Sequence, residues 1–474
     1  MRERARILGG LRHVLADDPK RFLTPLRLST RTDDAESLSA EVLPLASACR
    51  WIERHAARTL RTRRLGVRGR PLWLWGVDAE IRREPFGEVL IIGPGNFPLF
   101  LPGVQTLQAL AAGNRVRIKP APGGADAMRR LADAWVALGV PRDTLEVLDT
   151  STDAAEAALD TADLVVLTGG EATGRAVRGR CAERGIPLIA ELSGHDVAYV
   201  LPGADAELAA RCVAFGVRMN GGATCIAPRR VLVHPPRRDV FLNTLRAELD
   251  GVPGTPAPEA VVRRAAALVE QAVAAGGGCI AGGVPDGPTI RPTVLTDVPD
   301  DAALHNQDLF APVVSVGDLP DASEALPRSG FGLGASVFGP EAAARAFASR
   351  LNAGVVTIND VIVPTADPRL PFGGRGRSGY GVTRGAEGLL AMTRPKAVSV
   401  RRRRVYPHLR ATDAHTLPML TALLGTLHGR GWAARSRHAR DLVRVFRAQT
   451  RDGVGPGAGR RAAKPHSNPN EPRP

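Results

Sequence analysis

The sequence predicts an α/β protein with two parallel-sheet domains, and three observations lead to this prediction. Short apolar runs alternate with segments of helical spacing along most of the chain, a pattern typical of parallel sheets covered by helices. The chain has 474 residues, which is more than one hydrophobic core usually serves. Its 44% of apolar residues is enough to bury two or three such cores.

The chain before the first alternating region is predicted to form surface helices and a ribbon. Residues 1–60 carry apolar residues at helical spacing, which predicts helices packed on a larger body. Leucines and tryptophans then alternate over 72–75, ahead of Val77 and Ile81. This extended pattern predicts a hairpin that protrudes from the first domain over 64–86 and is a candidate subunit contact.

The first alternating region begins at Phe86, and its strands end in small or polar residues. Ligands bind open parallel sheets beyond the carboxyl ends of the strands. These ends are predicted at Pro94, Gly95 and Asn96, at Lys119, and at Gly169 and Gly170. Gly169 and Gly174 form a GxxxxG spacing before a helix predicted from Gly174, and such glycines let a pyrophosphate approach a helix N-terminus. A plain tight turn explains the spacing equally well.

The second alternating region spans residues 186–360 and predicts a second α/β domain. Its predicted helices cover 205–218, 238–248, 258–275 and 341–351. Stretches rich in Pro and Gly at 251–259 and 281–292 are predicted to be surface loops, because they propagate neither a helix nor a ladder.

The net charge of +15 is concentrated at the C-terminal end. Residues 401–474 hold sixteen Lys and Arg against four Asp and Glu, a net of +12, so the rest of the chain is nearly neutral. Only four of the 63 basic residues are Lys, which a genomic preference for Arg codons explains as readily as a binding surface. Nucleic-acid binding is therefore not expected.

The cysteines and the hydropathy pattern favour a reducing compartment. Five cysteines are scattered without CxxC spacing or His pairs, which predicts neither a metal site nor a disulfide framework. The N-terminus has no apolar signal region, and no run of eighteen apolar residues occurs. We therefore expect a cytoplasmic protein.

Three residues have reactive or polar side chains at positions that suit a catalytic role. Cys225 lies between a Gly-Gly-Ala-Thr run and an Ile-Ala-Pro turn, where small neighbours let a substrate approach a thiol. Glu191 ends a predicted strand and is placed to accept a proton, and Asn96 offers an amide donor for an oxyanion. In isolation, plainer interpretations are favoured: a buried cysteine, a solvated carboxylate and a turn-forming Asn.

Seven short sequence blocks, taken in chain order, indicate the function more specifically than these single residues do. They are GPGNFPL (93–99), ALAAGNRVRIKP (109–120), LTGGEATGR (167–175), ELSG (191–194), MNGGATCIAPRRV (219–231), LFAPVV (309–314) and LPFGGRGRSGYG (370–381). Together they resemble the aldehyde dehydrogenase superfamily over roughly residues 40–400. The nucleophile block, the NDVIVP run at 359–364 and the short N-terminal region resemble its class 3, fatty-aldehyde-dehydrogenase-like branch.

The resemblance implies a domain organisation and an assembly. A Rossmann-like cofactor domain would cover 1–190, with the ribbon at 64–86 as an oligomerisation arm. A catalytic α/β domain would cover 191–370, a bridging segment 371–400, and a basic tail 401–474. A homodimer is implied.

The resemblance also implies a reaction. Cys225 would attack an aldehyde to give a thiohemiacetal whose oxyanion is held by Asn96 and the Cys225 backbone N–H. After hydride transfer to NAD or NADP, hydrolysis of the thioester would release the carboxylic acid, and Glu191 would activate the Cys225 thiol, the hydrolytic water, or both. The cofactor-binding residues implied are Pro94, Gly95, Lys119, Gly169, Gly170, Gly174, Leu192, Asp308 and Phe310. Which aldehyde reacts is not readable from the sequence.

Two departures from the family pattern concern the cofactor. Pro122 stands where a carboxylate usually contacts the adenosine ribose, so repulsion of a 2′-phosphate is expected to be weaker and both NAD and NADP to be accepted. Asp308 stands where a Glu usually holds the nicotinamide ribose, and it is one methylene shorter.

Two alternatives to this function stay open. A CoA-acylating aldehyde dehydrogenase is less favoured, because hydrolysis is the step that uses Glu191. An inactive basic binding protein on this fold would leave the presence of Cys225, Glu191, Asn96 and Lys119 unexplained.

The tail is predicted to contain two helices, at 417–429 and 440–450, and a disordered end over 453–474. The second helix is basic and amphipathic, which makes peripheral membrane contact an alternative to a solvated tail.

Overall fold

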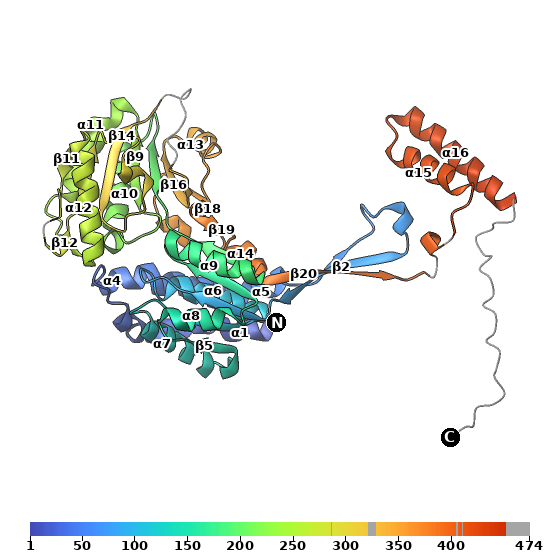
Figure 1. The fold of residues 1–474 in the computed structure, drawn as a ribbon, viewed down its shortest axis with the longest axis horizontal. Coiled ribbons are helices and arrows are strands. Elements are labelled where there is room, and N and C mark those ends of the chain that lie inside the picture. The colour runs from blue at the N-terminus through green and yellow to red at the C-terminus, as the bar shows by residue number, and fades with distance from the viewer. Residues whose placement is uncertain (286, 321–328, 404–405, 410, 452–474) are drawn as a thin grey trace, which may run out of the picture. The chain divides into compact units, whose positions relative to one another are not determined.

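The computed structural model describes residues 1–285, 287–320, 329–403, 406–409 and 411–451. The chain divides into two compact units (Figure 1). The first unit contains Met1–Arg70 and Asp78–Ser399, and the second contains Pro71–Val77 and the chain from Val400. The predicted disordered end over 453–474 lies outside the described residues.

The first large sheet of the first unit has six strands. In sheet order they are β19 (Gly379–Tyr380), β7 (Leu188–Glu191), β6 (Leu164–Thr168), β3 (Glu88–Ile92), β4 (Arg115–Lys119) and β5 (Leu145–Val147). All neighbours run parallel except β19, which pairs antiparallel with β7. Predicted strand ends at Asn96, Lys119 and Gly169 therefore lie along one edge, as expected for parallel strands.

Helices cover both faces of this sheet because successive side chains of its strands point to opposite sides. Val89 and Ile91 pack into a core with the N-terminal helices, whereas Leu90 and Ile92 pack with helices of the other face. The first face is covered by α1 (Arg2–Gly9), α2 (Leu11–Asp17), α5 (Leu43–Thr59), α6 (Phe100–Ala112), α7 (Ala125–Ala137) and α14 (Gly385–Ala391). The second face is covered by α8 (Thr152–Leu159) and α9 (Glu171–Arg184).

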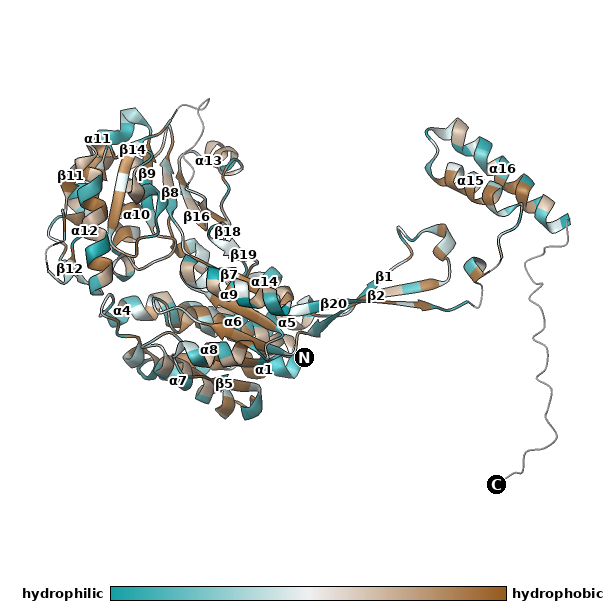
Figure 2. Cartoon of the chain, in the orientation of Figure 1, coloured by the Kyte–Doolittle hydropathy of each residue, from teal (hydrophilic) through white to brown (hydrophobic). Residues whose placement is uncertain are grey.

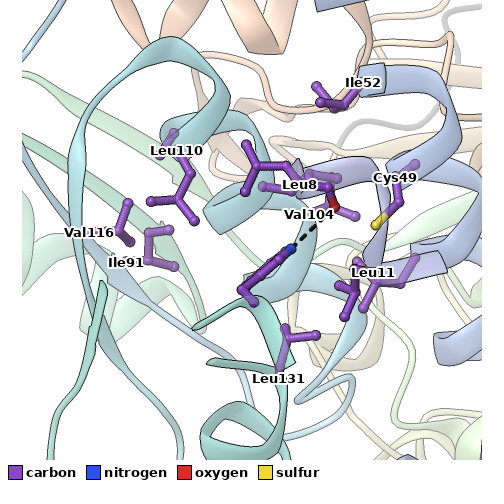
Figure 3. Packing of buried hydrophobic residues seen from close by; sticks show 14 of the residues in the cluster. Leu8, Leu11, Cys49, Ile52, Ile91, Val104, Leu110, Val116 and Leu131 are labelled. Carbon is purple, nitrogen blue, oxygen red and sulfur yellow. Dashed lines mark hydrogen bonds between the residues drawn. The ribbon is translucent and has the colours of Figure 1, made fainter. Parts of the chain in front are cut away.

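The core of the first face ties the N-terminus to the sheet (Figure 3). Leu8 and Leu11 belong to the same cluster of buried side chains as Val104 and Leu131. Trp135 is fully buried, and its indole N–H donates to the Leu8 carbonyl at 3.3 Å. The predicted surface helices over 1–60 are thus confirmed as a layer packed on the larger body.

The second large sheet has seven strands. In sheet order they are β11 (Gly278–Ala281), β13 (Thr293–Thr296), β14 (Val313–Asp318), β9 (Pro228–Val233), β8 (Asp196–Val200), β16 (Gly334–Phe338) and β17 (Val355–Ile358). Its covering helices are α10 (Ala206–Arg218), α11 (Arg238–Leu249), α12 (Glu259–Ala274) and α13 (Glu341–Ala348). The prediction of a second α/β layered body is confirmed, but the strand predicted at its start is not part of it. That strand is β7, which pairs with β6 in the first sheet.

Two loop predictions in this region were incomplete. The stretches 251–259 and 281–292 contain β10 (Thr255–Pro256) and β12 (Thr289–Ile290), which pair antiparallel. Ile290 is fully buried, so the pairing is fixed by tertiary packing that a composition rich in Pro and Gly conceals. The helix expected from Gly174 begins earlier, at Glu171, with Gly170 as its N-cap.

The predicted ribbon is present, but its tip differs from the prediction. β1 (Arg63–Leu65) pairs antiparallel with β2 (Val77–Pro85), and β20 (Thr393–Arg401) completes a three-stranded sheet. Residues 72–75 are not extended: Leu72–Leu74 form a 3₁₀ turn closed by the Trp75 N–H donating to the Leu72 carbonyl at 3.1 Å. These side chains are exposed, so no buried face enforces the alternation that their sequence suggested.

The second unit contains a helical hairpin, α15 (Thr416–His428) and α16 (Trp432–Arg451). Both predicted tail helices are present, and α16 begins eight residues earlier than the predicted 440. Gly425 permits the close approach, because a Cβ there would meet the His438 ring. Figure 2 shows hydrophobic colour along α15 and a mixture along α16. Among the described residues, no helix has the length and apolarity needed to cross a bilayer.

Candidate active site

A cavity of about 620 Å³ in the first unit collects most of the predicted site residues. It is lined by Cys225, Glu191 and Asn96, and by the predicted cofactor residues Pro94, Gly95, Gly169, Gly170, Leu192, Asp308 and Phe310. Lys119 and Gly174 are not among its lining residues. Segments far apart in the sequence thus meet where the pattern predicted.

The loop before Cys225 depends on three residues with left-handed backbone. Asn220, Gly221 and Gly222 have φ of 51°, 57° and 79°. Asn and Gly tolerate this region best. A Cβ at Gly222 would also meet the backbone of Ala311 and Pro312. The Asn-Gly-Gly run therefore lets the loop before Cys225 lie directly on a second segment of the chain.

Arg229 holds the same loop in place by hydrogen bonds to backbone carbonyls. Its side chain is 3% exposed and donates to the carbonyls of Ala311 at 2.5 Å, Gly222 at 2.5 Å and Thr224 at 3.2 Å. On the other side, Gly194 is required because a Cβ there would strike the Cys225 carbonyl. The thiol is thereby held at one place in the cavity.

Asn96 is oriented toward the loop before Cys225. Its amide N–H donates to the Ala223 carbonyl at 2.9 Å, and Asn220 donates to the Asn96 carbonyl at 2.8 Å. An amide nitrogen carries two hydrogens, so one remains for a ligand in the cavity.

A buried ion pair supports the segment that carries Asn96. Arg31 and Glu41 pair with both side chains fully buried. The Glu41 carboxylate also accepts from the backbone N–H groups of Leu99 at 2.7 Å and Phe100 at 3.0 Å, where α6 begins. A carboxylate is favourable at a helix N-terminus because it satisfies free N–H groups and complements the helix dipole.

Glu191 ends β7 and is 3% exposed. Its carboxylate accepts a hydrogen bond from Thr383. Burial raises the pKa of Glu191, while Arg384 and the hydroxyls of Thr383 and Thr168 lower it. The group is thus a dry carboxylate whose charge depends on its few polar neighbours.

Cys225 is half-buried at the cavity wall. Burial, followed by the carboxylates of Asp196 and Glu191, raises the pKa of the Cys225 thiol to about 12. Arg384 acts in the opposite direction. The thiol is therefore protonated at neutral pH, and its reaction requires a proton acceptor or an added positive charge.

Two observations are consistent with a dinucleotide bound by the residues that the resemblance implies. Asp308 lines the cavity, and its buried Oδ1 has no hydrogen-bond partner among the described residues, which suits a ribose hydroxyl donor. Gly170 caps α9, and Gly174 lies so close to Leu192 that a Cβ would approach the leucine side chain to 2.6 Å. The second glycine of the GxxxxG spacing is explained by this packing.

Several residues of the site escaped the sequence reasoning. They are Arg31, Glu41, Asn220, Arg229, Thr383 and Arg384. Each acts on residues far away in the sequence, as Thr383 does on Glu191 across 192 positions. Local signals existed for some of them: Asn220 and Arg229 lie within the block that contains Cys225, and Thr383 and Arg384 follow the glycine turn of the SGYG segment.

The chain belongs to the aldehyde dehydrogenase family, whose model matches residues 1–398. The resemblance carried by the seven sequence blocks is thereby confirmed, and the class 3 branch stays a prediction. The 76 residues after the match include the helical hairpin.

Relatives with known names share much of the chain's length. It is 32% identical over 420 residues to the 4,4'-diapolycopene aldehyde oxidase of a Methylomonas species, covering 83% of this chain and 76% of that protein. It is 33% identical to a succinate-semialdehyde dehydrogenase (NADP+) of Mycobacterium ulcerans, covering 77% and 82%. It is 35% identical to a benzaldehyde dehydrogenase (NAD+) of Pseudomonas putida, covering 63% and 65%. The relatives thus include NADP- and NAD-dependent enzymes, as the resemblance implied.

Solved structures agree with the fold prediction. The NAD+ complex of an aldehyde dehydrogenase from Bacillus cereus has a TM-score of 0.78 at 25% identity and covers 85% of this chain and 84% of that one. A Mycobacterium tuberculosis aldehyde dehydrogenase complexed with NAD+ has a TM-score of 0.77 at 25% identity, with 85% and 86% covered. The predicted α/β class with Rossmann-like parallel sheets is confirmed.

We expect Glu41→Gln to destabilise the protein, because it leaves the buried Arg31 guanidinium without its counter-charge. Breaking a buried pair in this way costs about 3–5 kcal/mol. The free energy of unfolding in urea measures the effect. Glu53→Gln is the matched control, because its partner Arg12 is partly exposed and such pairs contribute about 0–1 kcal/mol. Equal losses in the two variants would contradict this account of the Asn96 support.

Proposed function

We propose that this chain oxidises an aldehyde to the carboxylic acid, with NAD or NADP as acceptor, through a covalent intermediate on Cys225. The observation that carries the proposal is the meeting of a thiol, a buried carboxylate and an amide donor in one cavity. Each group has a required part in aldehyde oxidation: nucleophile, base and oxyanion donor. Membership of the family supports the same reaction.

The chain's own residues account for the bond-making steps. Glu191 takes the proton of the Cys225 thiol, the sulfur attacks the carbonyl carbon, and the oxygen becomes an oxyanion. Glu191 releases this proton to solvent before hydrolysis. The free N–H of the Asn96 side chain and the backbone N–H of Cys225 are the donors proposed to hold it. The dinucleotide, when bound, supplies the hydride acceptor that turns the thiohemiacetal into a thioester.

Glu191 is the proposed base for hydrolysis. It takes a proton from a water molecule, whose oxygen attacks the thioester carbon. The C–S bond then breaks, and the Cys225 sulfur takes that proton from Glu191 and leaves as the thiol. Thr383 donates to one oxygen of the Glu191 carboxylate, and a carboxylate has further acceptor sites for a water molecule. A dry site favours this step because it keeps other water out.

The cavity favours an apolar aldehyde. Apart from the reacting groups, its wall is made mostly of aromatic and aliphatic side chains, including Leu43, Phe100, Phe215, Met219, Ile362 and Phe372. Apolar lining with few polar groups binds apolar ligands best. The relatives named for benzaldehyde and diapolycopene are consistent with such a substrate.

We expect Cys225→Ser to abolish oxidation of benzaldehyde while dinucleotide binding stays nearly unchanged, because only the covalent step is lost. Formation of the reduced nicotinamide measures the first property, and isothermal titration with NAD the second. Cys279→Ser, at an exposed cysteine outside the cavity, is the control that keeps activity. Near-normal turnover by Cys225→Ser would overturn the assignment of the nucleophile.

We expect a higher kcat/KM for benzaldehyde than for succinate semialdehyde, by roughly tenfold or more, since a carboxylate loses hydration in an apolar wall. Steady-state rates with both aldehydes at saturating dinucleotide measure this ratio. A preference for succinate semialdehyde would contradict the apolar substrate and would indicate that a group in the cavity binds the carboxylate.

We expect the enzyme to use both NAD and NADP, and Pro122→Glu to shift the ratio of their kcat/KM values toward NAD. Pro122 lies in an exposed turn shortly after Lys119, so a carboxylate fits there without repacking. It would accept hydrogen bonds from a ribose diol and repel a 2′-phosphate. Strict use of NAD by the wild type, unchanged in the variant, would show that another group determines the choice.

The ribbon is the proposed contact of a homodimer in the cytoplasm. Within the described residues, β1 and β20 form the two outer strands of the three-stranded sheet. Outer strands offer unpaired N–H and C=O groups on which another chain can pair. The domain boundaries 1–190, 191–370, 371–400 and 401–474 likewise remain proposals.

The hairpin α15–α16 is the proposed peripheral membrane contact. Leu417, Leu420 and Leu424 recur at three- and four-residue spacing on α15 and are 74%, 53% and 62% exposed. Trp432, Val443 and Phe446 are likewise exposed on α16. Its exposed arginines are Arg435, Arg437, Arg440, Arg444, Arg447 and Arg451. Apolar and cationic side chains together bind the surface of an anionic bilayer.

We expect the full chain to sediment with phosphatidylserine vesicles but not with phosphatidylcholine vesicles, and less so at high salt, because salt screens the attraction. Truncation after Val400, and separately Leu420→Ser with Leu424→Ser, should remove sedimentation and leave benzaldehyde turnover intact. A full chain that stays in solution with both vesicles would contradict the membrane contact.

A further inference from the structure

Arg384 is a buried cation in the wall of the cavity. Its side chain is 5% exposed, and among the described residues no carboxylate lies within ion-pair distance of it. One guanidinium nitrogen, Nη1, donates to the Thr365 carbonyl at 2.8 Å, and Nε has no partner among those residues. A buried charge without a counter-charge is costly, so its presence calls for a function.

The backbone of Arg384 adds a second, independent cost. Its φ and ψ are 61° and 168°, a region that is nearly restricted to glycine. An arginine there carries strain on the order of 1–3 kcal/mol. Since glycine is the residue that would fit this turn without strain, the arginine side chain itself must contribute something that glycine cannot.

The surroundings fix the guanidinium in place. It lies over the Phe372 ring at 4.0 Å from the ring centre and near the Phe100 ring at 5.4 Å. The Arg384 backbone N–H donates to the Gln108 side chain at 2.9 Å. Aromatic faces attract a cation and also keep water away from it. A charge in such a dry place acts more strongly on its neighbours than one in water.

Those neighbours are the reacting groups. Arg384 lines the same cavity as Cys225 and Glu191. The residue before it, Thr383, donates the hydrogen bond that holds the Glu191 carboxylate. One short segment thus brings a hydroxyl and a cation to the base.

We propose that Arg384 is a positioning residue of the reaction, whose guanidinium supplies the positive charge that offsets the negative charges of the Glu191 carboxylate and the Cys225 thiolate. The inference rests on the proposed function, because it assigns a partner to that nucleophile and that base. The inference goes beyond the proposed function because it identifies Arg384 as the source of positive charge near Cys225 and Glu191.

The other charged groups around Cys225 do not supply this positive charge. Those that act on Cys225 besides Arg384 are the carboxylates of Glu191, Asp196 and Asp308 and the guanidinium of Arg229. The three carboxylates oppose formation of a thiolate, and Arg229 is engaged by three backbone carbonyls. Around Glu191, the hydroxyls of Thr168 and Thr383 donate without carrying charge. Arg384 lowers the pKa of both Cys225 and Glu191 against the effect of burial.

The test compares Arg384→Gly, which suits the backbone but removes the charge, with Arg384→Lys, which keeps the charge. The rate of alkylation of Cys225 by iodoacetamide, located by peptide mass mapping, is followed against pH without aldehyde or dinucleotide. Arg384→Gly should react about tenfold more slowly at each pH below the thiol pKa, since an opposite charge nearby shifts a pKa by about one unit or more. Arg384→Lys should restore most of the rate.

Turnover provides the second readout. The acidic limb of kcat for benzaldehyde should move to higher pH in Arg384→Gly, because Glu191 then holds its proton more tightly, and return toward the wild type in Arg384→Lys. Arg369→Gln, at an exposed arginine, is the control that changes neither profile. If Arg384→Gly fails to fold, Arg384→Gln replaces it.

Unchanged alkylation and kcat profiles in a folded variant without the charge would overturn the proposal. A loss of activity with both profiles unmoved would do the same, since it would mark a purely structural residue. Because alkylation needs no substrate, a chain that alkylates as expected but oxidises no aldehyde would overturn the proposed function and leave the charge assignment standing.

Discussion

The proposed chemistry of this protein depends on the burial of Cys225 and Glu191 in a dry cavity. Glu191 is buried, Cys225 is half-buried, and the cavity between them is mainly apolar. In such surroundings a charge costs far more than in water, so the thiol and the carboxylate both favour their neutral forms. Each remaining polar contact in the cavity therefore has a large effect on when charge forms. Thr383 and Arg384 are central for this reason.

Confinement also requires segments to approach more closely than ordinary side chains allow. The Asn-Gly-Gly run before Cys225 takes three left-handed backbone conformations, and Gly194 leaves room for the Cys225 carbonyl. Arg229 then fastens the loop with three hydrogen bonds to backbone carbonyls. Similarly, the Arg31–Glu41 pair fixes the start of α6 behind Asn96. The proposed nucleophile, Cys225, and the proposed oxyanion donor, Asn96, thus each lie in a segment that one buried arginine supports.

Much of this arrangement was predictable because it follows from local patterns. Alternating strands and helices predicted the two sheets, and the carboxyl ends of parallel strands predicted that Asn96 and Gly169 lie at one edge. The strand that ends at Glu191 was predicted in the second region, but it pairs with β6 of the first sheet. Contacts between distant residues were not predictable, because nothing near Glu191 signals a hydroxyl 192 positions away. The prediction of an extended conformation at 72–75 was wrong for a related reason. An alternation of apolar residues indicates a strand only where one face is buried, and these side chains are exposed. Lys119 ends its strand as predicted but does not line the cavity.

The proposed reaction proceeds through an acyl group on Cys225 whose hydrolysis needs Glu191. Intact-protein mass spectrometry of Glu191→Gln, mixed with benzaldehyde and NAD, tests it most directly. The account predicts that one benzoyl group accumulates on the chain and that peptide mapping locates it at Cys225. Product formation without any adduct, or an adduct at another cysteine such as Cys212, would contradict it.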